Sequence, residues 1–133
     1  MAMSTAAGKT PVAEGSVFLI PLSNELLGAC RVVRQERLGW IVVLIDGFWP
    51  SAPELAEILA RPALICGQHE ARTVAGTPPK AFLCAGHAPL RFTETQVIVP
   101  PTPFKKWETL ARELAAEHAR RNKLARVAQQ KSK

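Results

Sequence analysis

The stretch Trp40-Ile-Val-Val-Leu-Ile45 decides the fold of this chain. All six residues are apolar, and the stretch lacks the alternation of apolar and polar residues that marks a strand with one exposed face. Short, unbroken apolar runs of this kind are typical of strands that are covered on both faces. We therefore predict that residues 39–46 form the most buried strand of a sheet.

Two segments with the same bias toward Val, Ile, Leu and Phe precede this strand. They are Ser16–Pro21 and Leu27–Arg34, and they are bounded by the turn-forming pair Ser23-Asn24 and by residues 35–38. Apolar segments separated by such turns predict consecutive strands of a meander. Pro21 has no N–H to donate to a neighbouring strand, so the first strand should end, bulge or lie at a sheet edge there.

A short helix should follow the third strand. Ser51 and Glu54 have the spacing of a capping box, in which the Ser hydroxyl accepts from the Glu N–H and the Glu carboxylate bonds back. We therefore expect the helix to begin at Ala52, and Pro62 should end it at about Ala60. Its apolar stripe consists of Leu55, Ile58 and Leu59.

The second half of the chain predicts further short strands and a long helix. Apolar segments favour strands over residues 63–66, 72–74, 81–84, 90–92 and 96–99. Thr102 is a suitable N-cap and Pro103 a suitable first residue for a helix that runs to about His118 or beyond. One face of this helix is apolar and should pack on the sheet: Trp107, Leu110, Ala111, Leu114, Ala115 and His118. The predicted fold class is therefore α+β, with a twisted, mostly antiparallel sheet, open or partly closed as a barrel, one short crossover helix and a long C-terminal helix.

Charge divides the chain into a neutral body and a cationic end. Residues 1–118 carry eleven basic and eleven acidic side chains, whereas residues 119–133 carry six basic and no acidic ones. A chain of 133 residues with 47% hydrophobic and 21% charged residues suits one globular domain. We predict a flexible leader over 1–13, a single domain over 14–118 and a basic C-terminal helix extension or tail over 119–133. The tail offers cations to nucleic acid or another acidic partner, namely Arg120, Arg121, Lys123 and Arg126.

The sequence favours a cytoplasmic protein that has no membrane partner. No apolar run approaches the roughly 18 residues that cross a bilayer, and residues 1–10 lack the apolar region of a secretory signal. Cys30, Cys66 and Cys84 are odd in number, form no Cys-x-x-Cys pair and lie in or beside apolar stretches. We expect them to be reduced, buried thiols.

Two Cys-x-x-His units offer an alternative that involves a metal. Cys66 and His69 form the first unit, and Cys84 and His87 form the second. Two thiolates and two imidazoles could complete a tetrahedral zinc site. The competing interpretation is that both units are ordinary strand ends, and we expect no cofactor. No residues stand at the spacing of a catalytic set, so we expect no enzymatic activity.

Phe48 and Trp49 lie together in the turn after the third strand. Aromatic residues at such a place either fold back as a lid on the core or stand out as anchors for a binding partner. Both interpretations are open at this point. On the second, the contact residues for a partner are Phe48 and Trp49 together with the cations of the tail.

Four motifs follow one another in the first half of the chain: an opening Glu14-Gly-Ser-Val-Phe-Leu-Ile-Pro-Leu-Ser, a second strand that begins Leu27-Gly-Ala-Cys-Arg-Val-Val, the strand Gly39 to Asp46 and the helix that follows Pro50-Ser-Ala-Pro. In these motifs the chain resembles the immunity protein 26 family of bacterial polymorphic toxin systems. The resemblance covers about residues 14 to 75, and Ser16 stands where the family has an acidic residue. It implies a mostly β, cytoplasmic protein that binds and neutralises a cognate toxin without chemistry of its own. It implies no particular binding residues.

Overall fold

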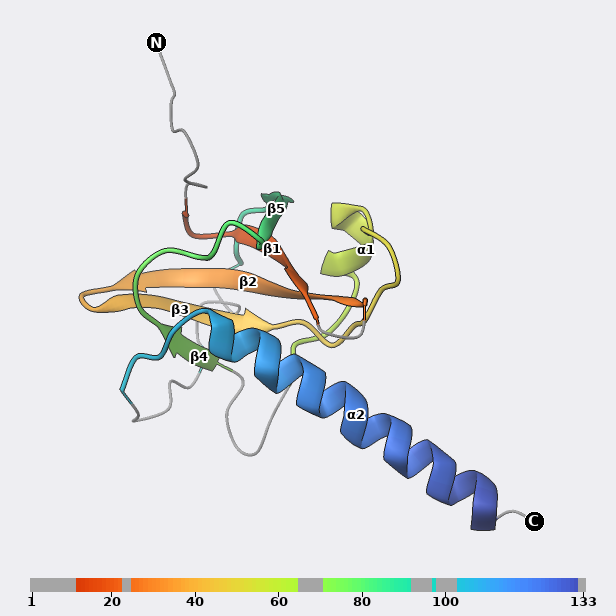
Figure 1. Cartoon of the computed structure of the whole chain (residues 1–133). Coiled ribbons are helices and arrows are strands. Elements are labelled where there is room, and N and C mark those ends of the chain that lie inside the picture. Colours follow the sequence, from red (N-terminus) through yellow and green to blue (C-terminus); the bar gives the residue numbers. More distant parts are fainter. Residues whose placement is uncertain (1–11, 23–24, 65–70, 92–96, 98–102, 132–133) are drawn as a thin grey trace.

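A sheet with a helix on each face forms the body of the protein (Figure 1). The computed structural model describes residues 12–22, 25–64, 71–91, 97 and 103–131, and for 129–131 the backbone alone. Within these residues the elements are β1 (Ser16–Pro21), β2 (Leu27–Glu36), β3 (Gly39–Leu44), α1 (Leu55–Leu59), β4 (Ala71–Val74), β5 (Leu83–His87) and α2 (Glu108–Lys131). The predicted α+β class is confirmed.

The described strands form one antiparallel sheet in the order β4-β3-β2-β1-β5. The first three strands are the predicted meander, with Val17 opposite Arg31 and Arg31 opposite Val43. Helix α1 connects the neighbouring strands β3 and β4, so the connection that crosses the sheet is the segment between β4 and β5. The barrel alternative was wrong, because β4 and β5 lie at opposite ends of the described sheet and do not pair with each other.

Alternation along the strands gives the sheet two apolar faces. One face packs against α2, and its cluster includes Phe18, Ile20, Cys30, Val32, Val42, Leu44, Trp107, Leu110 and Leu114. The other face packs against α1 through Val17, Leu19, Ala29 and Ile58, and continues as Val33, Ile41, Val43 and Ala71. Because both faces are covered, β1 and β2 are as deeply buried as β3 over most of their length. Each buried Val, Leu, Ile or Phe among them contributes roughly 1.5–3 kcal/mol by leaving water.

Gly28 allows α2 to approach the sheet closely. A Cβ at this position would lie 2.7 Å from the Leu114 Cδ1, well inside a normal contact. Leu114 itself is fully buried. The start of α2 is fixed by Trp107, whose ring lies edge-on to Phe18 and whose Nε1 donates to the Gly76 carbonyl at 3.1 Å. The predicted apolar stripe of the helix is therefore the face that packs on the sheet.

The predicted capping box at Ser51 and Glu54 was wrong. Helix α1 begins at Leu55, and Glu54 precedes it in an extended conformation with ψ 156° and no side-chain cap. A helix that begins at Ala52 is disfavoured, because the ring of Pro53 acts against helical geometry in the residue before it. The predicted end at about Ala60 agrees with the structure.

The predicted start of the long helix at Pro103 was also wrong. Residues 103–107 precede α2, and Lys105 pairs with β4 instead: its N–H donates to the Thr73 carbonyl at 3.1 Å and its own carbonyl accepts from Ala75 at 2.8 Å. This pairing keeps the segment extended, so the helix begins only at Glu108. The predicted cap Thr102 lies outside the described residues.

The remaining predicted segments had mixed outcomes. The strand over 72–74 is β4, and the strand expected over 81–84 is β5, displaced to Leu83–His87. Of the segment 63–66, Ala63 makes an isolated bridge to Ile45, and residues 65 and 66 are not described. Residues 90, 91 and 97 are not in strands, and the rest of 90–92 and 96–99 lies outside the described residues. So do residues 1–11 of the expected leader, whereas Val12 packs against the core.

Candidate functional site

Trp49 is part of the core, and Phe48 lies at its margin. The Trp49 side chain is 5% exposed, its backbone pairs with Leu27, and its indole Nε1 donates to the Glu57 carboxylate at 2.6 Å. Phe48 is half-buried against the α2 face, with its ring 4.9 Å from that of His118. Trp49 therefore serves as a lid in this structure and offers little area to a partner. Partner contact through Phe48 stays a prediction.

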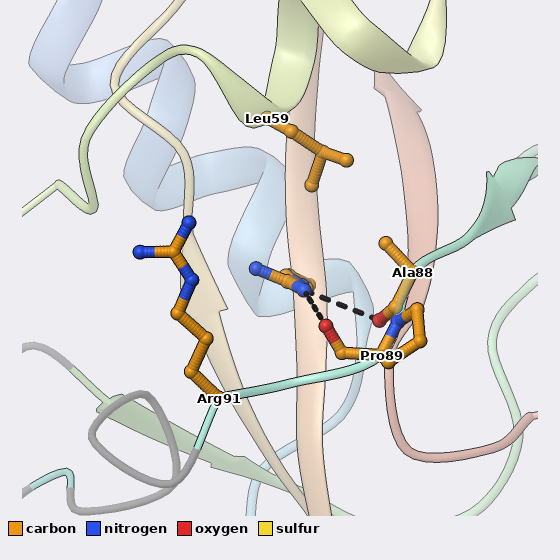
Figure 2. Close-up of a pocket in the computed structure, with 5 residues that line it drawn as sticks. Leu59, Ala88, Pro89 and Arg91 are labelled. Carbon is orange, nitrogen blue, oxygen red and sulfur yellow. Dashed lines mark hydrogen bonds between the residues drawn. The ribbon is translucent and has the colours of Figure 1, made fainter.

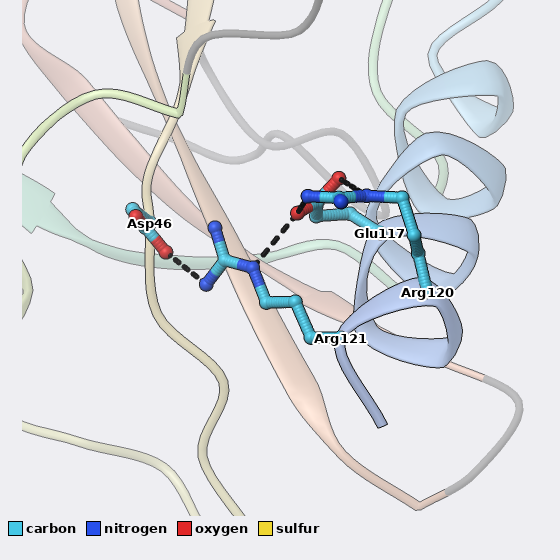
Figure 3. Close-up of polar contacts among 4 residues, drawn as sticks. All are labelled: Asp46, Glu117, Arg120 and Arg121. Carbon is cyan, nitrogen blue, oxygen red and sulfur yellow. Dashed lines mark hydrogen bonds and ion pairs between the residues drawn. The ribbon is translucent and has the colours of Figure 1, made fainter. Parts of the chain in front are cut away.

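A network of charges joins this turn to α2 (Figure 3). Arg121 Nη1 donates to Asp46 Oδ1 at 2.6 Å, and Arg121 Nε donates to Glu117 Oε2 at 2.8 Å. Arg120 holds the same carboxylate through both of its oxygens. The Arg121 guanidinium also lies 5.8 Å from the centre of the Phe48 ring. These contacts attach the fourth turn of α2 to the segment that directly follows β3.

The contacts of this network stabilise the charged forms of Glu117 and Arg121. Hydrogen bonds from Arg120 and then Arg121 lower the pKa of Glu117, while Asp46 and Glu117 raise the pKa of Arg121. Both shifts favour the charged forms. Two of the four predicted tail contacts, Arg120 and Arg121, are therefore engaged within the protein. Lys123 and Arg126, the other two, are exposed.

Beyond Arg121 the helix projects away from the body (Figure 1). Every residue from 122 to 128 is exposed, among them Leu124 and Val127 at 55% and 38%. Residues three apart lie on the same side of a helix, so these two side chains form one apolar strip. We call residues 122–128 the helical arm. It carries two large apolar side chains, Lys123, Arg126 and no acidic residue.

A pocket on the opposite face of the sheet contains a residue that the sequence analysis missed (Figure 2). Arg31, in the middle of β2, is 9% exposed and lies in register between Val17 and Val43. Its Nη2 donates to the carbonyls of Ala88 and Pro89 at 3.1 and 3.0 Å. A pocket of about 300 Å³ opens beside it, lined by Arg31, Leu59, Ala88, Pro89 and Arg91.

A signal for Arg31 was present in the sequence. It is the one charged residue in the run from Leu27 to Val33, and alternation places it on the same face as Ala29 and Val33. A charge on an otherwise apolar strand face needs partners when it is buried. Those partners lie 57 and 58 residues away, which is why the local pattern could not reveal them.

The expected cysteine environments are correct for one of two described residues. Cys30 is fully buried, and burial raises the pKa of its thiol to about 12, so it is inert. The expectation that Cys84 is buried was wrong, because β5 lies at the end of the sheet and its first two side chains are exposed. Cys66 lies outside the described residues.

One half of the predicted zinc site, Cys84 and His87, lies within the described residues. His87 Nε2 is 2.6 Å from the Glu14 carbonyl oxygen, and Cys84 Sγ lies 3.6 Å from the Gly86 carbonyl oxygen. Within the described ranges no three His, Cys, Asp or Glu side chains gather as metal ligands. Because Cys66 and His69 lie outside those ranges, a zinc site stays a prediction.

No protein-family model matches this chain, and no curated protein or solved structure is significantly similar to it. Of the two described helices, neither is long and apolar enough to cross a membrane.

Proposed function

We propose that this protein acts by binding another protein, and that the partner is a toxin which it neutralises in the manner of the immunity protein 26 family. The observation that carries the proposal is the helical arm. An exposed apolar strip on a projecting helix is the arrangement through which amphipathic helices bind apolar grooves. Leu124 and Val127 are the apolar contacts, and Lys123 and Arg126 supply charge beside them.

The arm defines the chemistry of its partner. An amphipathic helix binds by placing its apolar strip in a groove, while charges at the rim select the partner and speed association. The partner surface should therefore be an apolar groove with acidic residues along its rim. The Asp46 and Glu117 contacts of Arg121 hold the arm in place before binding, which reduces the conformational entropy lost in the complex.

The test is binding to the product of the gene adjacent to the one that encodes this chain. The two proteins are purified separately, and the dissociation constant is measured by calorimetry for the wild type, L124D, V127D and L38D. Leu38 is the matched control because it is exposed at 69% but lies in the turn between β2 and β3. We expect the arm variants to lose at least about tenfold in affinity and L38D to lose less than about threefold.

The outcomes separate the function from the interface. Absence of a wild-type complex, together with unchanged growth of cells that lose both genes or this gene alone, refutes the proposed function. A tight complex that L124D and V127D leave intact refutes the arm as the contact surface.

Nucleic-acid binding through residues 119–133 is the second candidate. Lys123 and Arg126 favour it, since both are exposed on the arm. Arg120 and Arg121 count against it, because their guanidiniums are engaged by Glu117 and Asp46. If it is correct, a DNA duplex should bind with strong salt dependence, and K123Q/R126Q should reduce the slope of log affinity against log salt by about 2. A DNA affinity that does not change with salt concentration would refute this second candidate.

A further inference from the structure

The pocket beside Arg31 has the chemistry of a carboxylate site. Two guanidiniums line it, those of Arg31 and Arg91, and no acidic residue is among its described lining residues. The planar fork of an arginine matches the two oxygens of a carboxylate. Arg31 supplies charge rather than the fork, because the carbonyls of Ala88 and Pro89 use both N–H groups of its Nη2 and its Nε is buried. Figure 2 shows Arg91 extending along the pocket from the same segment that carries Ala88 and Pro89.

Arg31 is held in a fixed position. Its side chain is more than nine-tenths buried on a sheet face, and two backbone carbonyls accept from the same nitrogen, Nη2. A charged group in such a setting keeps its field because little water screens it. A ligand therefore meets a cation whose orientation is set before binding, which is the condition for selective recognition by a small number of polar groups.

The rest of the lining decides between carboxylate and phosphate. Leu59, Ala88 and Pro89 supply apolar surface, which suits an aliphatic stem. Propionate carries such a stem whereas inorganic phosphate does not, so phosphate gains nothing from this apolar surface. At about 300 Å³ the pocket is at the lower end of the range for ligand sites. It has room for a group of the size of a glutamate side chain.

We infer that this pocket binds a carboxylate on a short aliphatic stem, with Arg31 and Arg91 as its two cations. The site is on the face of the sheet opposite α2 and is independent of the helical arm. Two sources share this chemistry, a small free acid and an acidic side chain of a protein, and the experiment distinguishes them.

The experiment uses the full chain and follows the Nε–Hε signals of its arginines by NMR at constant ionic strength. Propionate is the probe, propionamide is the neutral control, and inorganic phosphate tests the anion class. We expect saturable shifts at Arg31 and Arg91 with a dissociation constant on the order of 10 mM, no saturation with propionamide, and binding of phosphate at least about tenfold weaker.

Variants of exposed arginines complete the test without disturbing the core. R91Q should weaken propionate binding by about tenfold, whereas R61Q, which changes an exposed arginine just after α1 that does not line the pocket, should leave it within about twofold. An N-acetylated, C-amidated glutamate peptide that binds at least about threefold more tightly than propionate identifies a protein side chain as the ligand, and equal or weaker binding identifies a free acid.

Three results would overturn the inference. The first is a set of linear, unsaturated shifts up to about 100 mM propionate, a concentration well above the expected dissociation constant. The second is the same response in R91Q as in the wild type. The third is shifts at Arg37 and Arg61 that equal those at Arg31 and Arg91. Each of these can be read whether or not the adjacent gene product binds the protein, so failure of the pocket and failure of the proposed function are separate outcomes.

Discussion

Replacing Gly28 with alanine should have opposite effects on stability in two backgrounds. In the wild type, the new methyl lies 2.7 Å from the Leu114 Cδ1. Overpacking of this kind costs typically 1–3 kcal/mol, and the reduced freedom of the unfolded chain offsets about 0.4–1 kcal/mol of it. We expect Gly28→Ala to lower the free energy of unfolding by about 1 kcal/mol.

The contact geometry changes when Leu114 is shortened. Leu114→Ala removes Cγ and both methyl carbons from a fully buried site and should cost about 3 kcal/mol. The nearest remaining atom to a Cβ at position 28 is then the Cβ of residue 114, at an ordinary 3.7 Å. In this background the added methyl fills part of the cavity, so Gly28→Ala should stabilise by about 0.5–1 kcal/mol.

The free energies of unfolding of the wild type, the two single variants and the double variant are measured by urea unfolding followed by tryptophan fluorescence. Leu110→Ala is the matched control, because Leu110 is equally buried on the same helix face but is not among the atoms nearest to Gly28. There Gly28→Ala should still destabilise. The same sign of the Gly28→Ala effect in the wild-type and Leu114→Ala backgrounds would refute the proposed contact between α2 and β2.

Three further predictions follow from single contacts. Burial raises the pKa of Cys30 from 9.0 to about 12, so between these pH values only the thiol of the unfolded chain ionises. The free energy of unfolding should therefore be unaffected by this group below pH 9 and should fall by about 1.4 kcal/mol per pH unit above it. Cys30→Ala should flatten this slope, as measured by urea unfolding at each pH. Trp49→Phe should cost about 1 kcal/mol by removing the bond to Glu57, whereas Trp49→Ala should cost about 3–5 kcal/mol; a melting temperature unchanged by Trp49→Ala would contradict its burial. Arg120 and Arg121 lower the pKa of Glu117 below 4.5, so its charge stabilises the fold above pH 4.5 and this stabilisation is lost as the pH falls. Glu117→Gln should therefore lower the free energy of unfolding more at pH 7 than at pH 3. Equal losses at the two pH values would argue against the network in Figure 3.

The strands and the docked face of α2 could be predicted because their signals do not depend on context. The runs at Ser16–Pro21 and Gly39–Leu44 have a composition that suits a buried strand wherever it pairs. The stripe through Trp107, Leu110 and Leu114 has the period of a helix and buries as expected. In these cases local preference and tertiary packing agree.

Helix starts could not be predicted because other contacts decided them. Ser51 and Glu54 form a capping box by spacing, but Pro53 restricts the residue before it. Pro103 suits a first helical position, but the backbone of Lys105 pairs with β4 at the end of the sheet. A partner at long sequence separation outweighed the local signal, and the same applies to the burial of Arg31 beneath Ala88 and Pro89.

The contact between Arg121 and Asp46 also has a mechanical consequence. Asp46 lies three residues before Trp49, whose indole donates to Glu57 of α1, so the short segment 46–49 connects an ion pair on α2 to a hydrogen bond on α1. Force applied at the tip of α2 would reach α1 through this segment and through Trp49, which is itself buried in the core.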